Sequence, residues 1–344
     1  MNRIESVDVF RLLAVIAVIT LHSAPLSADL ARDDEIYKYL DVVMNQIARF
    51  AVPFFFVISG YFWGLKVRRT DNPIPLTNIM AKRIGIIFIS WCFIYLLPLN
   101  LSSIFEYGIL GPVKVVYWNI LNLAKQPTTL LMQGTRDHLW FLVGLLFSLY
   151  ISVFFVHKRF VKTLFVFSIF LYTFGLLAKA YSSTPVGIDV DFNTRNGPFF
   201  GLLLFVSGFM ISRFDPSVKW LSYGLLISCF GFVLHFSEIY LLWKYFGISL
   251  EQDYVIGTYF MGVGVATVAL SNHRIFRVPA LSTIGRMVLG IYAIHVIFVD
   301  LFRVVDKQID HPFWEISYVI LVLGLSVVSV VLLSKNRITQ KIVV

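Results

Sequence analysis

The sequence has few charged residues for its length. Asp, Glu, Lys and Arg make up 14% of the 344 residues, whereas a soluble domain usually carries about a quarter. Apolar residues make up 58% of the chain, and the mean hydropathy is +0.79. This composition excludes an ordinary soluble domain and indicates a membrane protein with several spans.

The chain also lacks the patterns of the common metal, redox and hydrolase sites. Cys92 and Cys229 are its two cysteines, far apart in apolar stretches, and the seven histidines are dispersed singly. No CxxC, HExxH, GxSxG or Walker A sequence occurs. We therefore expect no metal, and any chemistry must depend on His and Arg side chains.

Apolar stretches long enough to cross a bilayer recur along the whole chain. A spanning helix needs about 20 such residues, so the sequence predicts an all-α polytopic membrane protein with about ten transmembrane helices in a single domain, 1–344. The predicted spans are 8–25, 46–65, 83–101, 138–156, 161–180, 197–213, 218–238, 253–270, 284–303 and 313–334. Residues 102–125 carry Glu106, Lys114 and a Gly-Pro pair, which predicts an interfacial or re-entrant segment.

The charges between these spans predict the orientation. With a cytoplasmic N terminus, seventeen Lys and Arg residues fall on the cytoplasmic side and ten on the other side. The positive-inside rule therefore places both termini in the cytoplasm. The net charge of +9 is spread over short connections, where it contacts anionic lipid rather than nucleic acid.

The first apolar stretch resembles a signal peptide, but Asp8 and Arg11 near its start favour a retained span.

The first span holds two ionisable residues, Arg11 and His22. Eleven residues of helix rise about 16 Å and complete about three turns, so both side chains project from nearly the same face. Asp8 lies three residues before Arg11, where it can form an ion pair. The spacing alone favours an Arg11 that snorkels to the interface, with Asp8 as its ion-pair partner, and a His22 that caps the helix. An ionisable group inside a span is nevertheless a functional candidate by default.

Further candidates lie where the predicted spans meet the outer surface. Arg49 precedes Pro53, which leaves a backbone carbonyl near residue 49 without its helical partner, so an anionic or carbonyl group could bind there. The stretch RDHLWFLVG at 136–144 places Arg136, His138 and Trp140 together, with a carboxylate next to the imidazole. Arg195 precedes another span at the same side.

Other polar residues have simpler interpretations. His295 lies near the middle of its span with Tyr292 three residues before it, as in a buried structural histidine with a tyrosine partner. His235 and Glu238 are spaced as a pair at an outer helix end, and Asp253 is interpreted as a solvated loop acid. Two Ser-Gly pairs, in ISGYF at 58–62 and VSGFM at 206–210, are too short a match to establish an internal repeat.

Four stretches resemble the membrane-bound acyltransferase-3 family. They are RIESVDVFRLLAVIAVITLH with its Asp-x-x-Arg and later histidine, RFAVPFFFVISGYFWG, HLWFLVGLLF at 138–147 and GIYAIHVIF at 290–298. Each is weak alone, but their order and the predicted span count both agree with the family. With no hydrolase-like domain after Val344, the chain is most similar to stand-alone members that O-acetylate surface glycans such as enterobacterial common antigen.

The resemblance implies the reaction and the residues involved. An acyl group, commonly acetyl from acetyl-CoA, would pass to a hydroxyl of a cell-surface or lipid-linked glycan at the bacterial cytoplasmic (inner) membrane. His22 and Arg11 would be catalytic, with His22 as general base and Arg11 orienting the CoA. The residues expected to bind substrate are Asp8, Arg49, His138, Trp140, Arg136, Arg195, Tyr292 and His295.

Two other classes of membrane protein use similar residues. A secondary transporter or flippase for an anionic or glycan substrate also places Arg and His inside its spans, but it would move substrate without consuming acyl-CoA. A glycan polymerase or ligase more typically carries a large external loop, and the longest external connection expected here has about 36 residues.

Overall fold

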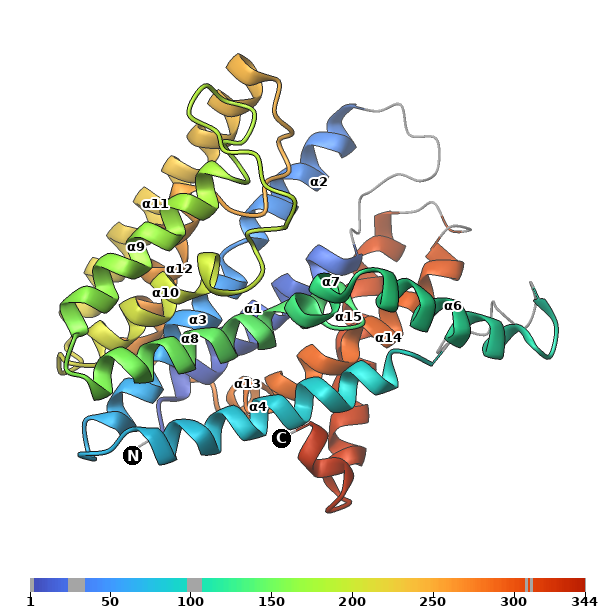
Figure 1. Cartoon of the computed structure of the whole chain (residues 1–344), viewed down its shortest axis with the longest axis horizontal. Helices are drawn as coiled ribbons and strands as arrows, with labels where there is room; N and C mark the ends of the chain where they lie inside the picture. The colour runs from blue at the N-terminus through green and yellow to red at the C-terminus, as the bar shows by residue number, and fades with distance from the viewer. Residues whose placement is uncertain (1–2, 24–34, 98–106, 307–308, 310–311, 344) are drawn as a thin grey trace.

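The computed structural model describes residues 3–23, 35–97, 107–306, 309 and 312–343. All regular structure in these ranges is helical, as predicted, and Figure 1 shows the helices forming one bundle. The helices are α1 (Glu5–Ser23), α2 (Glu35–Ala48), α3 (Ala51–Val67), α4 (Ile74–Ile94), α6 (Gly111–Lys125), α7 (Pro127–Gln133), η1 (Asp137–Leu139), α8 (Trp140–His157), α9 (Val161–Leu177), α10 (Pro198–Ile211), α11 (Lys219–Phe246), α12 (Ile256–Leu270), η2 (Arg274–Phe276), α13 (Pro279–Gly285), α14 (Val288–Asp306), α15 (Pro312–Ser334) and η3 (Thr339–Ile342).

The helices fit a polytopic membrane protein. Among the described residues, six helices are long and apolar enough to cross a membrane, α2 and α3 counting as one, and the pair α13 and α14 forms a seventh if its two bent parts are one span. Three shorter apolar helices, α9, α10 and α12, accompany them. Each of the ten predicted spans overlaps one of these helices. The predicted start at residue 83 was late, because α4 begins at Ile74 and carries Lys82 and Arg83 on an exposed face.

Helices α6 and α7 form an excursion from one end of the bundle. Figure 1 shows α6 extending away from the other helices, and neither helix is among those long and apolar enough to span. The chain after α7 lies next to the end of α4, because Thr135 donates a hydrogen bond to the carbonyl oxygen of Cys92 at 2.9 Å. The chain therefore leaves α4 and enters α8 at the same end of the bundle, as expected for a segment that does not cross.

Helices α3 and α10 cross through their glycines at the centre of the bundle. A Cβ atom on Gly60 would lie 1.9 Å from the Phe205 carbonyl oxygen, and one on Gly208 would lie 1.9 Å from that of Val57. The contact is reciprocal, since each helix supplies a glycine to the backbone of the other. The two Ser-Gly pairs of the sequence are therefore the two sides of one helix crossing, where small residues permit close approach.

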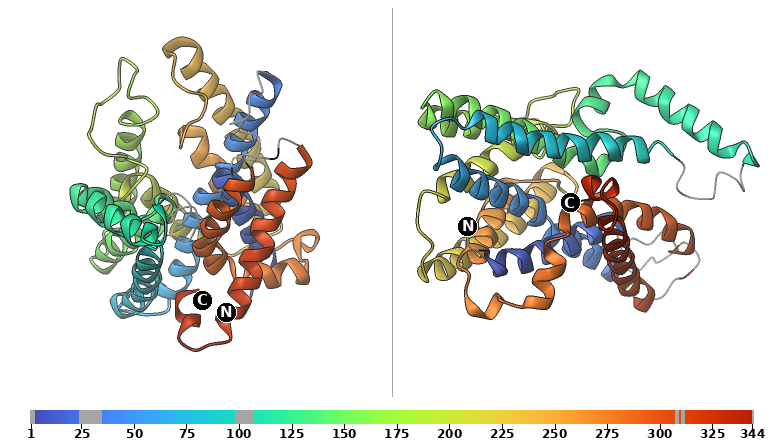
Figure 2. Two further views of the ribbon diagram at one scale, coloured as in Figure 1. Left: turned by 90° about the vertical axis from the view of Figure 1, so that its right-hand side faces the viewer. Right: turned by 90° about the horizontal axis from the view of Figure 1, so that it is seen from below.

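The predicted span 284–303 is not one straight helix. The chain bends by 70° between α13 and α14, and α13 packs against α1 so closely that a Cβ on Gly285 would lie 1.8 Å from the Asp8 carbonyl oxygen. The bend turns α14 back into the bundle and carries Tyr292 and His295 to the end of α1. In both Figure 1 and Figure 2 the N and C termini lie near the same side of the molecule.

Candidate functional site

A cavity of the described structure lies beside the C-terminal end of α1. Its volume is about 200 Å³, and its walls come from α1, the break between α2 and α3, η1, α8, the start of α10, α14 and the connection that precedes α12. The lining residues are Val18, Leu21, His22, Arg49, Val52, Pro53, Asp137, His138, Trp140, Phe141, Arg195, Phe200, Asp253 and Tyr292.

His22 presents its ring to this cavity from the last turn of α1. Its ring centroid lies 6.0 Å from that of His138 and 5.3 Å from that of His295. No described residue forms a hydrogen bond with the His22 ring. An imidazole with free nitrogens beside a cavity can accept a proton from a bound hydroxyl, which is the role that the sequence predicts for it.

His138 and His295 lie behind His22 and are buried. Their ring centroids are 5.4 Å apart. The sequence predicts Tyr292 as the partner of His295 on one helix face, but the partner is the backbone, since Nδ1 of His295 lies 2.7 Å from the Tyr292 carbonyl oxygen. The Tyr292 hydroxyl instead donates to the carbonyl oxygen of His138. Tyr292 therefore connects α14 to the segment that positions His138.

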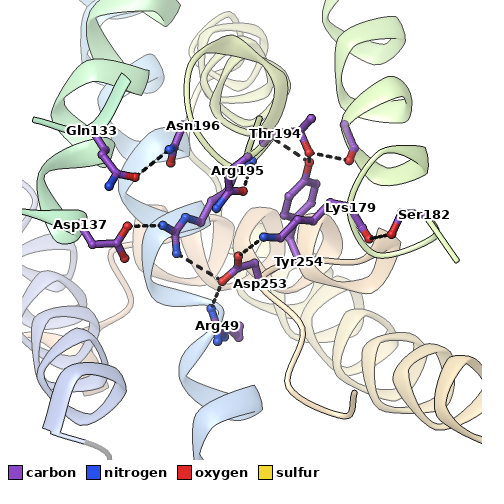
Figure 3. Close-up of polar contacts among 12 residues, drawn as sticks. Arg49, Gln133, Asp137, Lys179, Ser182, Thr194, Arg195, Asn196, Asp253 and Tyr254 are labelled. Carbon is purple, nitrogen blue, oxygen red and sulfur yellow. Dashed lines mark hydrogen bonds and ion pairs between the residues drawn. The ribbon is translucent and has the colours of Figure 1, made fainter. Parts of the chain in front are cut away.

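Three cations converge on Asp253, as Figure 3 shows, and Asp253 is one of the residues that line the cavity. Arg49 lies 2.9 Å, Lys179 3.0 Å and Arg195 3.4 Å from its carboxylate oxygens. Burial alone would raise the pKa of this carboxyl, but Arg195, Arg49 and Lys179 outweigh burial and hold the pKa well below its usual value. The interpretation of Asp253 as a solvated loop acid was wrong, because its side chain is only 16% exposed and lies among these cations.

Arg195 joins this network to the aromatic wall of the cavity. Its guanidinium donates to Asp137 at 2.7 Å and lies 5.0 Å from the centre of a Trp140 ring. Its side chain is 15% exposed, and its Nε atom has no hydrogen-bond partner among the described residues. A bound group with an acceptor oxygen would satisfy this buried N–H.

Arg11 and Asp8 lie far from the cavity, toward the other end of α1. Their predicted ion pair is present at 2.9 Å, and Arg3 contacts the same carboxylate at 2.8 Å. The Arg11 guanidinium lies 5.3 Å from the centre of the Phe62 ring. Neither Asp8 nor Arg11 lines the cavity. Of its ionisable residues, the first span therefore supplies His22 to the cavity and holds the others in a separate charged cluster near its start.

Arg136 also lies outside the cavity. Its side chain is 43% exposed and forms an ion pair with Asp300 of α14. The predicted set is therefore divided in space. His22, Arg49, His138, Trp140, Arg195 and Tyr292 line the cavity, His295 contacts the His22 ring from behind, and Asp8, Arg11 and Arg136 lie elsewhere.

His235 and Glu238 do not pair with each other. His235 lies 3.0 Å from both Thr258 and Gln46, which ties α11 to α12 and α2. Glu238 accepts the backbone N–H groups of Ile256 at 2.9 Å and Gly257 at 3.0 Å. It therefore caps the N-terminus of α12, immediately after Asp253.

Sequence reasoning missed Lys179 and Asp253 as members of the site, and it noted Asp137 only as the carboxylate next to His138. Lys179 and Asp253 are single charges at the ends of predicted spans, and their only signal was a position near the same predicted outer surface as Arg49 and Arg195. Among the described residues, no group of three His, Cys, Asp or Glu side chains is arranged to hold a metal ion.

The chain was compared with known families, curated proteins and solved structures. A family model described as an acyltransferase domain matches residues 4–335. Two amino-acid racemases of Enterococcus faecalis are each 28% identical, one over 220 residues that cover 60% of this chain and 28% of the racemase, the other over 178 residues that cover 51% and 23%. A serine/alanine racemase of Enterococcus gallinarum is 26% identical over 225 residues, which cover 61% of this chain and 29% of the racemase.

These matches differ in how much of each protein they cover. The chain spans less than a third of the length of the curated relatives that it matches, and no solved structure matches it. The family model, in contrast, covers nearly the whole chain, including every helix that lines the cavity. This chain therefore belongs to the acyltransferase-3 family.

Proposed function

We propose that the protein is an O-acyltransferase of the bacterial cytoplasmic membrane, and specifically an O-acetyltransferase. It transfers the acyl group of acyl-CoA to a hydroxyl of a cell-surface or lipid-linked glycan. The observation that carries the proposal is the His22 imidazole, which has no hydrogen-bond partner among the described residues, at a cavity lined by two arginines. Family membership supports acyl transfer in general, and the chemistry of these side chains supports a hydroxyl acceptor.

The His22 ring would act as general base. A sugar hydroxyl is a weak nucleophile until its proton is removed, and imidazole is suited to that task because its intrinsic pKa lies near neutrality. Trp140 and Phe141 line the cavity beside His22 and provide an aromatic surface for a sugar ring. His22 would remove the proton of the acceptor hydroxyl while that oxygen attacks the thioester carbonyl carbon.

Arg49 and Arg195 are the groups best placed to stabilise the negative charge that develops on the carbonyl oxygen. Both line the cavity, and their shared partner Asp253 fixes their positions before substrate binds. Fixed donors of this kind are worth far more in a partly buried site than in water. Arg136, which the sequence predicts to bind substrate, does not line the cavity and is paired with Asp300, so it is unsuitable for this role.

The donor would approach from the opposite end of α1. Arg11 lies eleven residues before His22, a helical rise of about 16 Å, and the exposed residues Arg68, Arg69 and Lys82 lie on neighbouring helix ends predicted to be cytoplasmic. In this arrangement the basic residues attract the CoA phosphates and anionic lipid, Arg11 binds the CoA, and the thioester extends toward His22. The arrangement joins a cytoplasmic donor to an outer acceptor through one membrane domain.

The racemase activity in the names of the Enterococcus proteins is not proposed for this chain. The shared region is less than a third of each racemase, and the family model that covers this chain describes an acyltransferase domain. A transporter or flippase for an anionic glycan is the second candidate, because the arginines that line the cavity suit such a substrate.

Acetylation of surface glycans tests the proposal directly. Mass spectrometry of glycans from cells with the wild-type protein is expected to show acetyl groups that are absent from cells with His22→Ala at equal membrane abundance. Cys229→Ala is the matched control, since Cys229 is exposed and remote from the cavity. Full acetylation in the His22→Ala cells contradicts the catalytic role. Glycan movement by purified wild-type protein in liposomes without release of free CoA identifies a transporter.

A further inference from the structure

Three histidines from separate segments meet at one wall of the cavity. His22 comes from α1, His138 from η1 and His295 from α14, and their three ring-to-ring distances are 6.0, 5.3 and 5.4 Å. His22 alone suffices as a general base, so His138 and His295 require a separate explanation. Both are buried, and the Nε2 atom of each lacks a hydrogen-bond partner among the described residues.

The backbone determines which nitrogen of His295 carries the proton. Nδ1 lies 2.7 Å from the carbonyl oxygen of Tyr292, and a carbonyl oxygen can only accept a hydrogen bond. Nδ1 is therefore protonated, and in the neutral ring Nε2 holds a lone pair. His295 thus presents a hydrogen-bond acceptor whose orientation is fixed by its own helix.

His138 packs beside this acceptor. Its Nε2 atom is buried and has no hydrogen-bond partner among the described residues. The Tyr292 hydroxyl fixes the position of the His138 backbone, and the Tyr95 ring packs against the imidazole with centroids 5.0 Å apart. His138 therefore adds an aromatic surface next to the rings of His22 and His295.

One fixed acceptor, Nε2 of His295, thus lies beside the His22 ring, which can donate. The neutral His22 ring carries one N–H and one lone pair, and no described residue fixes which nitrogen has the proton. A small rotation of this side chain would give its single N–H to Nε2 of His295. Its remaining nitrogen would then present a lone pair to the cavity, as a general base requires. Buried acceptors are rarely left without a donor, and this contact supplies one to His295.

We propose that His295 is a positioning residue that accepts a hydrogen bond from His22 and so orients its basic nitrogen toward the acceptor hydroxyl, with the His138 ring packed against both. The inference rests on the proposed acyl transfer. In that step the hydroxyl proton moves to His22, the new C–O bond forms at the thioester carbonyl carbon, the C–S bond breaks, and the departing thiolate receives the proton. His22 is cationic in between, and the Nε2 lone pair of His295 stabilises the cation. His295 stays neutral throughout.

Two substitutions at residue 295 separate positioning from packing. His295→Leu removes the acceptor, whereas His295→Gln retains an amide oxygen that can accept from His22. In purified full-length protein with acetyl-CoA and glycan, His295→Leu is expected to lower kcat by about 10- to 100-fold, as removal of an orienting partner does elsewhere, with the KM of both substrates unchanged. His295→Gln is expected to recover most of the lost kcat. Ser152→Ala is the control, because it removes another buried polar atom without a partner, on α8 and outside the cavity.

Nitrogen-15 NMR of the histidine-labelled protein provides a readout that needs neither substrate nor the leucine variant. The Nε2 signal of His295 is expected in the non-protonated range and is expected to move in His22→Ala. The inference is overturned if Nε2 of His295 is protonated, if His22→Ala leaves the His295 signal unchanged, or if His295→Leu retains wild-type kcat. Wild-type protein that transfers no acyl group refutes the proposed function instead, and the NMR result then decides the histidine contact by itself.

Discussion

The crossing of α3 and α10 makes a quantitative prediction for Gly208→Ala. The new Cβ would lie 1.9 Å from the Val57 carbonyl oxygen, whereas real Cβ atoms stay at least 3.0 Å from such neighbours. The helices must therefore separate by about 1 Å, because the obstructing atom is backbone and cannot rotate away. A gap of that size forfeits about a quarter to a half of each dispersion contact across the interface.

Large aromatic residues pack across this same crossing. The Trp63 ring lies 5.4 Å from that of Phe205 and 5.3 Å from that of Phe209. Overpacking a core of this kind costs about 1–3 kcal/mol, which exceeds the gain of about 0.5–1 kcal/mol that alanine brings to a helix interior. We expect Gly208→Ala to be destabilised by about 1–2 kcal/mol in net terms and to lose activity, because Arg49 precedes α3 and Arg195 precedes α10.

Thermal unfolding in detergent, followed by size-exclusion chromatography, measures the effect. Gly85→Ala is the matched control, since α4 leaves nothing within 4 Å of a Cβ at that position. Its melting temperature is expected to equal or exceed that of the wild type. The reasoning is refuted if Gly208→Ala melts at or above the wild-type temperature, because the two backbones would then not be in contact.

Three further predictions concern the charged groups of the site. Asp253→Asn is expected to lower the melting temperature at neutral pH. The ionised Asp253 carboxylate stabilises the folded protein, because its pKa in the folded state lies below the usual value. This stabilisation persists down to about pH 4 and is lost as the pH falls further. The melting difference between wild type and variant should thus shrink in acid, and a difference that grows in acid contradicts the assignment. Arg195→Ala is expected to lower kcat by about 100-fold or more, while Arg136→Ala stays within about twofold of wild type in the same assay; equal losses would show that Arg136 also acts at the cavity. Glu238→Gln weakens the cap of α12 and is expected to lower the free energy of unfolding by about 1–3 kcal/mol. The kcat of the folded fraction is expected to stay unchanged, and a large fall in kcat would place Glu238 in the reaction.

The sequence predicted the helical membrane fold well because apolar length is a local property. Each of the ten predicted spans overlaps an apolar helix. The bend before α14 was missed because the residues on both sides are apolar, and a change of direction leaves no trace in hydropathy. The early start of α4 was missed because Lys82 and Arg83 suggest a loop, although a helix can carry both on one exposed face.

The site was predicted less completely because charge pairing is a long-range property. His22, Arg49, His138, Trp140 and Arg195 were each expected near a span end, and the structure brings them to one cavity. The shared role of Asp253 depends on a partner 204 positions earlier in the chain, which local sequence patterns cannot reveal.

Arg11 shows the limit of helix periodicity as an argument about sites. The spacing of Arg11 and His22 predicts a shared face, and α1 is continuous between them. Of the two, only His22 lines the cavity, because eleven residues of helix separate Arg11 from it by about 16 Å. Two residues on the same helix face can therefore lie too far apart along the helix axis to belong to one site.

The network around Asp253 has a consequence for the order in which the protein is made. Arg49, Lys179 and Arg195 are synthesised first, and the carboxylate that they share follows with the connection before α12. His295, which contacts the His22 ring, arrives later still, with α14. A ribosome must therefore deliver most of the chain to the membrane before any of it can form the cavity, so an unfinished chain has no working site.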